Sequence, residues 1–347
     1  MAGCDKTESD WKQAKDANTL PAYMNFIAKH LHGPHIDTRK QRFRVVPIVT
    51  LSMLSILRPP IVFTAKAQNS GAGETIADIR TRAEAGDAKA QYDLGVVYEN
   101  GSGVPQDQRE AATWFRKSAE QGNARAQNEF AEMYHTGRGV LQDNNEALRW
   151  FRRAADQGDV RAQFNLGLMY SKEEGVPKNL DEAVKWYRKA AEQGDADAQQ
   201  NLGIAYANGF GVSKNLDEAV RWFSKAADQD HPDAECEMGI SYMIGNFVPK
   251  DHAEAVKYFR KASEQGVGRA QFNLSVAYYT GDAVPKNVIE AYKWMRLSAA
   301  QGYERARNGL QTIRSAMTAD EIEEGNRLAS DFKPRERASL SNLGQNK

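Results

Sequence analysis

Cysteine and aromatic residues are scarce in this sequence. Its 347 residues include two cysteines, Cys4 and Cys236, which lie far apart. Two distant cysteines exclude a disulfide framework and a cysteine-rich zinc site. Aromatic residues make up 9% of the chain and charged residues 27%, and this balance suits a thin helical array with a large surface.

An excess of either charge is also absent. Acidic and basic residues number 46 each, so the formal net charge is zero. A protein that binds nucleic acid normally carries a basic excess, because its affinity depends on neutralising phosphates. We therefore expect no nucleic-acid partner, and no general attraction to an anionic membrane.

A motif of Gly-polar-x-x-Ala-Gln type recurs along the chain at a constant interval of 36 residues, with Asp230 once in place of glycine. Self-similarity at a fixed period of this size indicates stacked structural units. We read each unit as two helices joined by a turn. The marker glycines are Gly86, Gly122, Gly158, Gly194, Gly266 and Gly302.

The first predicted helix of each unit carries a buried stripe. Ala198, Leu202 and Tyr206 have the i, i+4, i+8 spacing of one helix face. A glycine such as Gly203 inside this helix costs about 1 kcal/mol relative to alanine, so we expect a second helix to approach closely there. A glycine cap such as Gly209 ends the helix. The third unit has Glu173 at that position, which predicts the least regular loop.

The second predicted helix opens with Asn/Asp-x-x-Glu, as at Asn179 and Glu182. This spacing predicts a reciprocal capping box, so the recurring glutamate needs no catalytic role. An aromatic pair follows, as at Trp186 and Tyr187. Rings opposite small residues fill the space between helices, so we interpret the pair as core and not as a platform for bases or sugars.

The combined pattern A-x-x-x-L-G-x-x-Y, G-x-G-V and E-A-x-x-W-[FY]-x-x-A-A-x-Q-G resembles that of Sel-one-like repeats, relatives of tetratricopeptide repeats. Six full units span residues 86–301. A partial unit and a short closing helix follow, the latter opened by Thr318 and Glu321 as a capping box. The resemblance implies an all-α, α/α superhelical solenoid of six 36-residue helix-turn-helix repeats with a C-terminal closing helix.

The N-terminal part has a different composition. Residues 1–44 are predicted to hold a short helical hairpin, in which His30, His32 and His35 are better explained as a solvated helix end than as metal ligands. Residues 45–67 are apolar, follow several arginines and end in Ala-Lys-Ala. This pattern predicts a signal peptide or membrane anchor, and hence a periplasmic or cell-envelope location. The alternative is a buried segment in a cytoplasmic protein.

The remaining boundaries follow from composition and from the repeats. We assign residues 68–85 to a linker and a leading half-repeat helix, residues 86–333 to the repeat array, and residues 334–347 to a disordered polar tail. The sequence predicts no cofactor, no metal site and no catalytic residue. His135, His231 and His252 occupy different positions of the repeat, and no serine, histidine and carboxylate form a nucleophile–base set.

The family resemblance implies a concave groove, lined by the first helices, that binds a protein or peptide. Residues that differ from unit to unit are free to contact a partner. Asn165, Asn201 and Asn273 occupy a position from which related repeats present amides to a bound peptide, and arginines one turn earlier are candidate carboxylate partners. The predicted contacts are Tyr92, Arg125, His135, Arg161, Phe164, Asn165, Leu168, Asn201, Ile204, Arg269, Phe272, Asn273 and Tyr279.

The predicted function is therefore a non-enzymatic interaction scaffold in the bacterial cell envelope, with a protein or peptide partner. Fold alone does not establish this, because one fold hosts many functions. Two alternatives remain open: an exported hydrolase-like or glycan-binding protein of the cell envelope, and a cytoplasmic signalling adaptor. Any contact with a membrane is expected only through the N-terminal segment.

Overall fold

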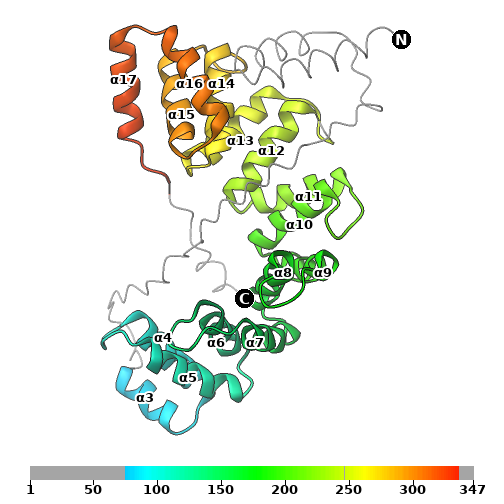
Figure 1. Ribbon diagram of the computed structural model, residues 1–347, viewed down its shortest axis with the longest axis vertical. Coiled ribbons are helices and arrows are strands. Elements are labelled where there is room, and N and C mark those ends of the chain that lie inside the picture. The colour runs from blue at the N-terminus through cyan, green and yellow to red at the C-terminus, as the bar shows by residue number, and fades with distance from the viewer. Residues whose placement is uncertain (1–74, 246, 336–347) are drawn as a thin grey trace. The chain divides into compact units, whose positions relative to one another are not determined.

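The computed structural model describes residues 75–245 and 247–335, and the described residues form helices and turns without any strand (Figure 1). The predicted hairpin at 1–44, the apolar segment at 45–67 and nearly all of the polar tail lie outside these residues. The leading half-repeat helix is present as α3 (Ile76–Glu84). A capping box between Thr75 and Asp78 caps the N-terminus of this helix.

Helix pairs then alternate along the described chain. The first helices of the units are α4 (Ala88–Asn100), α6 (Ala124–Thr136), α8 (Val160–Lys172), α10 (Ala196–Asn208), α12 (Pro232–Ile244), α14 (Gly268–Thr280) and α16 (Glu304–Ser315). The second helices are α5 (Gln108–Glu120), α7 (Asn144–Asp156), α9 (Leu180–Glu192), α11 (Leu216–Ala227), α13 (His252–Glu264) and α15 (Val288–Ala300). The closing helix is α17 (Ala319–Ser330).

Two compact units contain these helices, residues 75–215 and residues 216–335. Successive helices pack on one another from α3 to α10 in the first unit and from α11 to α16 in the second, and the closing helix α17 packs on α15. This consecutive packing of helix pairs confirms the predicted repeat fold. The capping box that opens α17, between Thr318 and Glu321, is also present.

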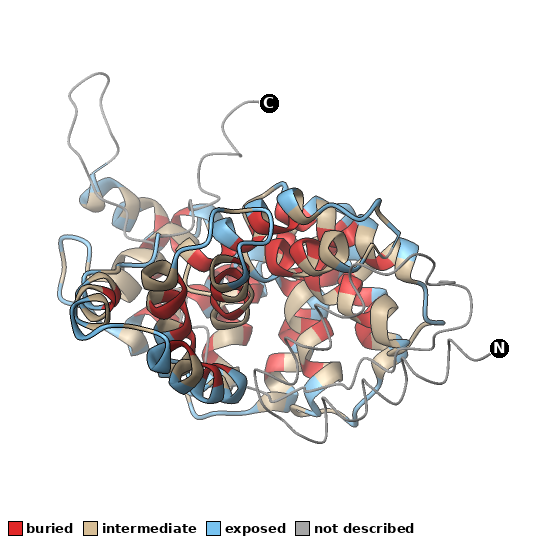
Figure 2. Ribbon diagram, turned by 90° about the horizontal axis from the view of Figure 1, so that it is seen from above, coloured by how far each residue is buried: buried red, intermediate tan, exposed pale blue. Residues whose placement is uncertain are grey.

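Buried residues lie mainly within the helices, and exposed residues gather in the connecting loops (Figure 2). Ala162 and Leu166 on α8 are fully buried. Gly167, beside them, confirms the expected close approach, since a β-carbon there would lie 2.4 Å from the ring of Tyr187 on α9. Gly95 and Gly239 meet Phe115 and Phe259 in the same way.

The loop after α8 differs from the prediction. Glu173 takes the left-handed conformation (φ 62°) that glycine adopts at the ends of α4, α6 and α10. Its backbone N–H donates to the carbonyl oxygen of Met169, as the glycine caps do to theirs. The expectation of an irregular loop was therefore wrong, because the backbone bonds that end the helix hold a non-glycine residue in this conformation.

The capping of the second helices also corrects a prediction. The side chain of Asn179 caps α9 as expected and accepts from the N–H of Glu182. The second bond of a capping box, from the N–H of Asn179 to the side chain of Glu182, does not form. That N–H donates instead to the carbonyl oxygen of Tyr170, 2.9 Å away. Glu182 instead binds Lys185 at 2.6 Å. The recurring glutamate thus forms a surface ion pair, also seen in Glu146–Arg149, Glu218–Arg221 and Glu254–Lys257.

Candidate partner-binding face

The variable residues of the first helices fall into three positions of the repeat, and these positions differ in how far they are buried. The first is buried in four of the six units, at Asn128, Gln200, Cys236 and Phe272, and half-buried at Tyr92 and Phe164. The other two, which we call the open positions, stay partly exposed in every unit. They hold Val96, Glu132, Leu168, Ile204, Ile240 and Val276, and then Glu99, His135, Ser171, Ala207, Met243 and Tyr279.

The two half-buried aromatic rings of the first position pack inside their own unit. Tyr92 on α4 lies 5.7 Å from the ring of Phe115, and Phe164 on α8 lies 6.0 Å from Tyr187, measured between ring centroids. Burial, and next the carboxylate of Glu129, raise the pKa of the Tyr92 hydroxyl to about 12. Both rings therefore serve mainly as core, while both residues stay partly exposed.

The three asparagines predicted to bind a peptide already make hydrogen bonds within the chain. The amide of Asn201 donates to the carbonyl oxygen of Asp197 at 2.9 Å, and that of Asn273 to the carbonyl oxygen of Arg269 at 3.1 Å. Asn165 differs, because its amide reaches the preceding unit and donates to Glu132. A bound peptide would have to compete with these bonds for the amide donors.

Two of the three predicted arginines have carboxylate partners in the preceding repeat of this chain. Arg161 lies 3.7 Å from Glu129, and Arg269 binds Glu237. Sequence reasoning overlooked both glutamates. The signal was present, because Glu129 lies 36 residues before Asn165 and Glu237 lies 36 before Asn273, so they share the asparagine position.

Arg125 on α6 is exposed and forms no ion pair with another described residue. It acts on Tyr92 and Asp159 through its charge. Since the other two arginines already have carboxylate partners, Arg125 is the predicted arginine best able to bind an added carboxylate.

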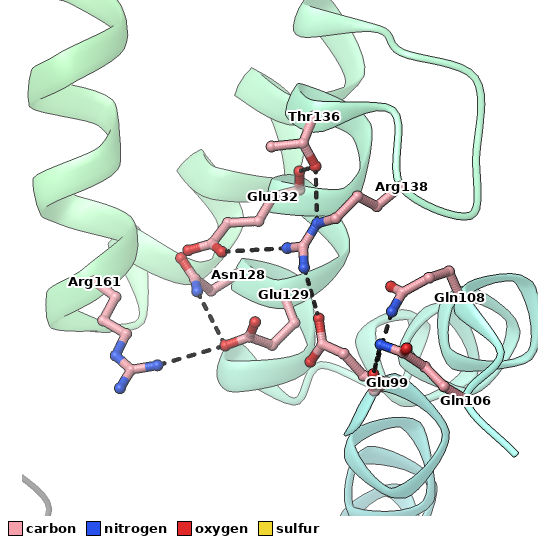
Figure 3. Close-up of polar contacts among 9 residues, drawn as sticks. All are labelled: Glu99, Gln106, Gln108, Asn128, Glu129, Glu132, Thr136, Arg138 and Arg161. Carbon is pink, nitrogen blue, oxygen red and sulfur yellow. Dashed lines mark hydrogen bonds and ion pairs between the residues drawn. The ribbon is translucent and has the colours of Figure 1, made fainter. Parts of the chain in front are cut away.

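A polar network connects three successive units across α4, α6 and α8 (Figure 3). Arg138, in the loop after α6, lies 3.1 Å from Glu99 on α4 and 3.8 Å from Glu132 on α6. Asn165 on α8 donates to Glu132 at 3.2 Å. Side chains from neighbouring helices are thereby held in one arrangement before any partner binds.

Two carboxyl groups of this network, those of Glu129 and Glu99, have pKa values that burial raises. Burial, then the charges of Glu132 and Glu99, raise the pKa of Glu129 to about 8. Arg161 opposes this rise. Burial also raises the pKa of Glu99, against the charge of Arg138. An added cation near these carboxylates would favour their charged forms, so the network can respond to a basic group.

The remaining predicted contacts occupy separate places. His135 lies between Asn144, at 2.9 Å from its Nδ1, and Glu174, at 3.6 Å from its Nε2. Phe272 is buried, with its ring centroid 5.3 Å from that of Tyr303. Tyr279 stays partly exposed, with the Lys286 ammonium 5.7 Å from its ring centroid. Leu168 and Ile204 are partly exposed apolar side chains.

Within residues 75–245 and 247–335, no group of three or more histidine, cysteine, aspartate or glutamate side chains is placed to hold a metal ion. The three N-terminal histidines lie outside this range. No helix of the described part is both long and apolar enough to cross a membrane.

Consecutive helix pairs at a 36-residue interval, with glycine-assisted contacts and recurring caps, define a helical repeat protein. The sequence pattern of the Sel1 repeat matches six consecutive segments, residues 88–123, 124–159, 160–195, 196–231, 232–267 and 268–303. The chain belongs to the Sel1 repeat family. This confirms the resemblance noted in the sequence and places the unit boundaries at the starts of the first helices.

Solved structures agree with this assignment. A protective antigen of uropathogenic Escherichia coli with an SLR fold is 34% identical over 74% of this chain, with a TM-score of 0.66. The match covers 56% of that antigen, so this chain corresponds to little more than half of it. A Sel1 repeat protein from Oxalobacter formigenes is 29% identical over 65% of this chain and all of its own, with a TM-score of 0.59. No curated protein matches this chain.

Proposed function

We propose that this protein is a non-catalytic scaffold that binds a peptide or protein on the face formed by its first helices. One observation carries the proposal. Positions that are constant between units, such as those of Ala162 and Leu166, are fully buried, whereas the open positions change from unit to unit and stay partly exposed. Residues not used for packing are the ones that can differ and meet a partner.

The chemistry of the open positions favours an extended peptide with apolar side chains. Leu168 and Ile204 offer apolar contacts in residues 75–215. Glu99 and Glu132 hold open positions in the two units before that of Leu168, and Arg138 neutralises their charges only in part. A segment with an apolar centre and a basic end would match this order, since the apolar contacts supply affinity and the charges fix direction.

Site-specific crosslinking can test the proposed face. A photo-reactive amino acid placed at residue 168 or 204 should crosslink to one discrete partner in the native host. The same amino acid at residue 149 is the control, because the Arg149 side chain is 70% exposed on the second helix α7. Equal crosslinking at all three positions would refute the proposal.

The identified partner, once purified, allows a quantitative test. We expect Leu168→Ser to weaken its binding by at least about tenfold, a loss typical of an apolar anchor at an interface. Arg149→Ser should leave the affinity unchanged. Circular dichroism melting checks that both variants fold. An unchanged affinity in a folded Leu168→Ser variant would move the binding site elsewhere.

We also propose that the protein acts in the bacterial cell envelope. The support is the basic, apolar and Ala-Lys-Ala sequence at 39–67, which lies outside the described residues, together with the likeness to a protein described as a protective antigen. Intact mass and N-terminal sequencing of the protein from fractions of its host test this. A mature chain starting at Gln68 is expected, whereas an unprocessed chain in the cytosol would refute it.

A further inference from the structure

A ladder of buried glutamines joins four of the first helices, α4, α6, α8 and α14, to the helices before and after each of them. The Nε2 of Gln163 on α8 donates to the carbonyl oxygen of Ala155 on α7 at 3.2 Å. Its Oε1 accepts from Gln193, the residue that ends α9, at 2.8 Å. The same pair of bonds surrounds Gln91, Gln127 and Gln271.

One unit replaces this glutamine by glutamate. Glu235 on α12 lies 36 residues after Gln199 and 36 before Gln271, and its side chain is fully buried. Gln265, which ends α13, donates to its Oε2 at 2.8 Å, as the corresponding glutamines do elsewhere. The other oxygen, Oε1, therefore stands where the ladder needs an N–H donor, and it has no hydrogen-bond partner among the described residues.

The carbonyl group that this donor would serve belongs to Ala227. In each complete rung the carbonyl lies eight residues before the ladder glutamine, and Ala227 lies eight residues before Glu235. When Glu235 is ionised, its carboxylate can only accept hydrogen bonds, so it cannot bond to the carbonyl oxygen of Ala227, which is also an acceptor. A neutral carboxylic acid can donate its proton there and complete the rung.

The charged groups around Glu235 do not compensate for its burial. Lys261 on α13 is 4.0 Å from Oε1 but is itself half exposed. Arg335, beyond α17, also favours the charged form, while Asp230, in the turn before α12, opposes it. Tyr258 on α13 also lies within electrostatic reach. Burial dominates and raises the pKa of Glu235 to about 7.

We propose that Glu235 is a proton-controlled joint of the repeat array, which closes the contact between α11, α12 and α13 when neutral and loosens it when charged. The carboxyl group of an unfolded chain has a pKa of 4.5, whereas the pKa in the folded protein is near 7. The folded protein thus holds more protons between these values. The closed joint loses stability as pH rises through this window.

Segment-resolved hydrogen exchange tests the joint in the full chain. Exchange rates divided by the intrinsic rate at each pH should rise in α11–α13 by up to about 100-fold from about pH 5 to about pH 8, since each unit of pKa shift contributes up to tenfold. Helix α15 is the internal reference and should change far less. Equal rises in α15 and in α11–α13 would refute a local joint.

Two substitutions separate the joint from other titrating groups. Glu235→Gln copies the other units, so it should fold and remove the pH dependence in α11–α13. Gln163→Glu, in the same position of another unit, should create such a dependence in α7–α9. An infrared band of protonated carboxylic acid at about pH 6 should be weaker in Glu235→Gln than in the natural chain, and the part that remains should belong to Glu129. A Glu235→Gln variant that keeps the full pH dependence would overturn the proposal.

Discussion

Gly167 on α8 faces the aromatic ring of Tyr187 on α9 so closely that a β-carbon would come 2.4 Å from the ring carbon Cε1. The glycine therefore sets the distance between the two helices of its unit. Helix propensity favours alanine there by about 1 kcal/mol, so the packing requirement outweighs the local preference.

Gly167→Ala should destabilise the protein by a net amount of about 1 kcal/mol, because overpacking costs about 1–3 kcal/mol and the gain in propensity offsets part of it. Urea unfolding measures the change. The same substitution made in a Tyr187→Leu background should cost less, since the flexible side chain can move away. Equal costs in both backgrounds would show that the ring does not impose the glycine.

The glutamine ladder should contribute measurably to stability. Gln163→Ala removes a buried bond to the carbonyl oxygen of Ala155 and the shorter of the two bonds that the Gln193 amide donates, leaving only the one to Gly158. We expect a loss of about 2 kcal/mol in the free energy of unfolding, because two hydrogen bonds are lost and each contributes about 1 kcal/mol. Gln142→Ala is the control, because Gln142 donates to His135 at the exposed surface. A loss as large for the control would contradict the role of burial.

In four places an arginine donates to the hydroxyl of the tyrosine 18 residues later, and the tyrosine Tyr242 has serine at the arginine position. Arg188 donates to the hydroxyl of Tyr206 at 2.9 Å, and Arg260 to that of Tyr278 at 3.0 Å. At the matching position Ser224 lines a cleft of about 450 Å³, together with Trp222 and Tyr242. Ser224 and Tyr242, which both line this cleft, thus occupy the positions that the arginine and the tyrosine hold in the other pairs.

Ser224→Arg should fill this cleft and stabilise the protein by about 1 kcal/mol, the usual net value of one hydrogen bond. Thermal unfolding followed by circular dichroism measures the gain. Ser224→Ala, which cannot reach the hydroxyl of Tyr242, should give none. A gain of the same size from alanine would assign the effect to helix propensity.

The raised pKa of Glu129, about 8, makes a prediction about pH. Since the unfolded chain releases this proton near 4.5, the folded protein binds more protons between the two values. Stability should therefore fall as pH rises from about 5 to about 8. Glu129→Gln should reduce this fall and stabilise the protein most above about pH 8.

Hydrogen exchange of the full chain in increasing urea, resolved by segment, measures the stability of residues 75–215 separately. It thereby distinguishes the effect of Glu129 from that of Glu235, which lies on α12. The control is Glu120→Gln, since Glu120 forms only a surface ion pair with Arg116 at 3.8 Å. Its pH profile should match that of the natural chain. A fall in stability that persists unchanged in Glu129→Gln would rule out this carboxyl group as its source.

Much of the fold could be predicted because the signals are local and repeated. The spacing of Ala198, Leu202 and Tyr206 defines a helix face within three turns, and cap residues act within four residues of the helix end. Repetition at 36 residues then multiplies each weak signal. The capping box of Thr318 and Glu321 forms as predicted. Those predicted for the second helices do not, as at α9, because the N–H of Asn179 donates to the carbonyl oxygen of Tyr170, nine residues away.

The site was less predictable, because its contacts join residues more than 30 positions apart. Whether a variable residue such as Phe272 is buried or a residue such as Leu168 stays partly exposed depends on how closely successive helix pairs stack. The pairing of Arg161 with Glu129, and the exposed guanidinium of Arg125, depend on the same stacking.

Repeat length, helix order and the buried stripe were thus properties of the amino-acid order, since they arise from backbone and side-chain interactions within one or two turns. The division between core and open positions, the network around Glu129 and the unpaired oxygen of Glu235 required three-dimensional packing. Burial and desolvation act on a side chain only through neighbours that the folded chain brings together.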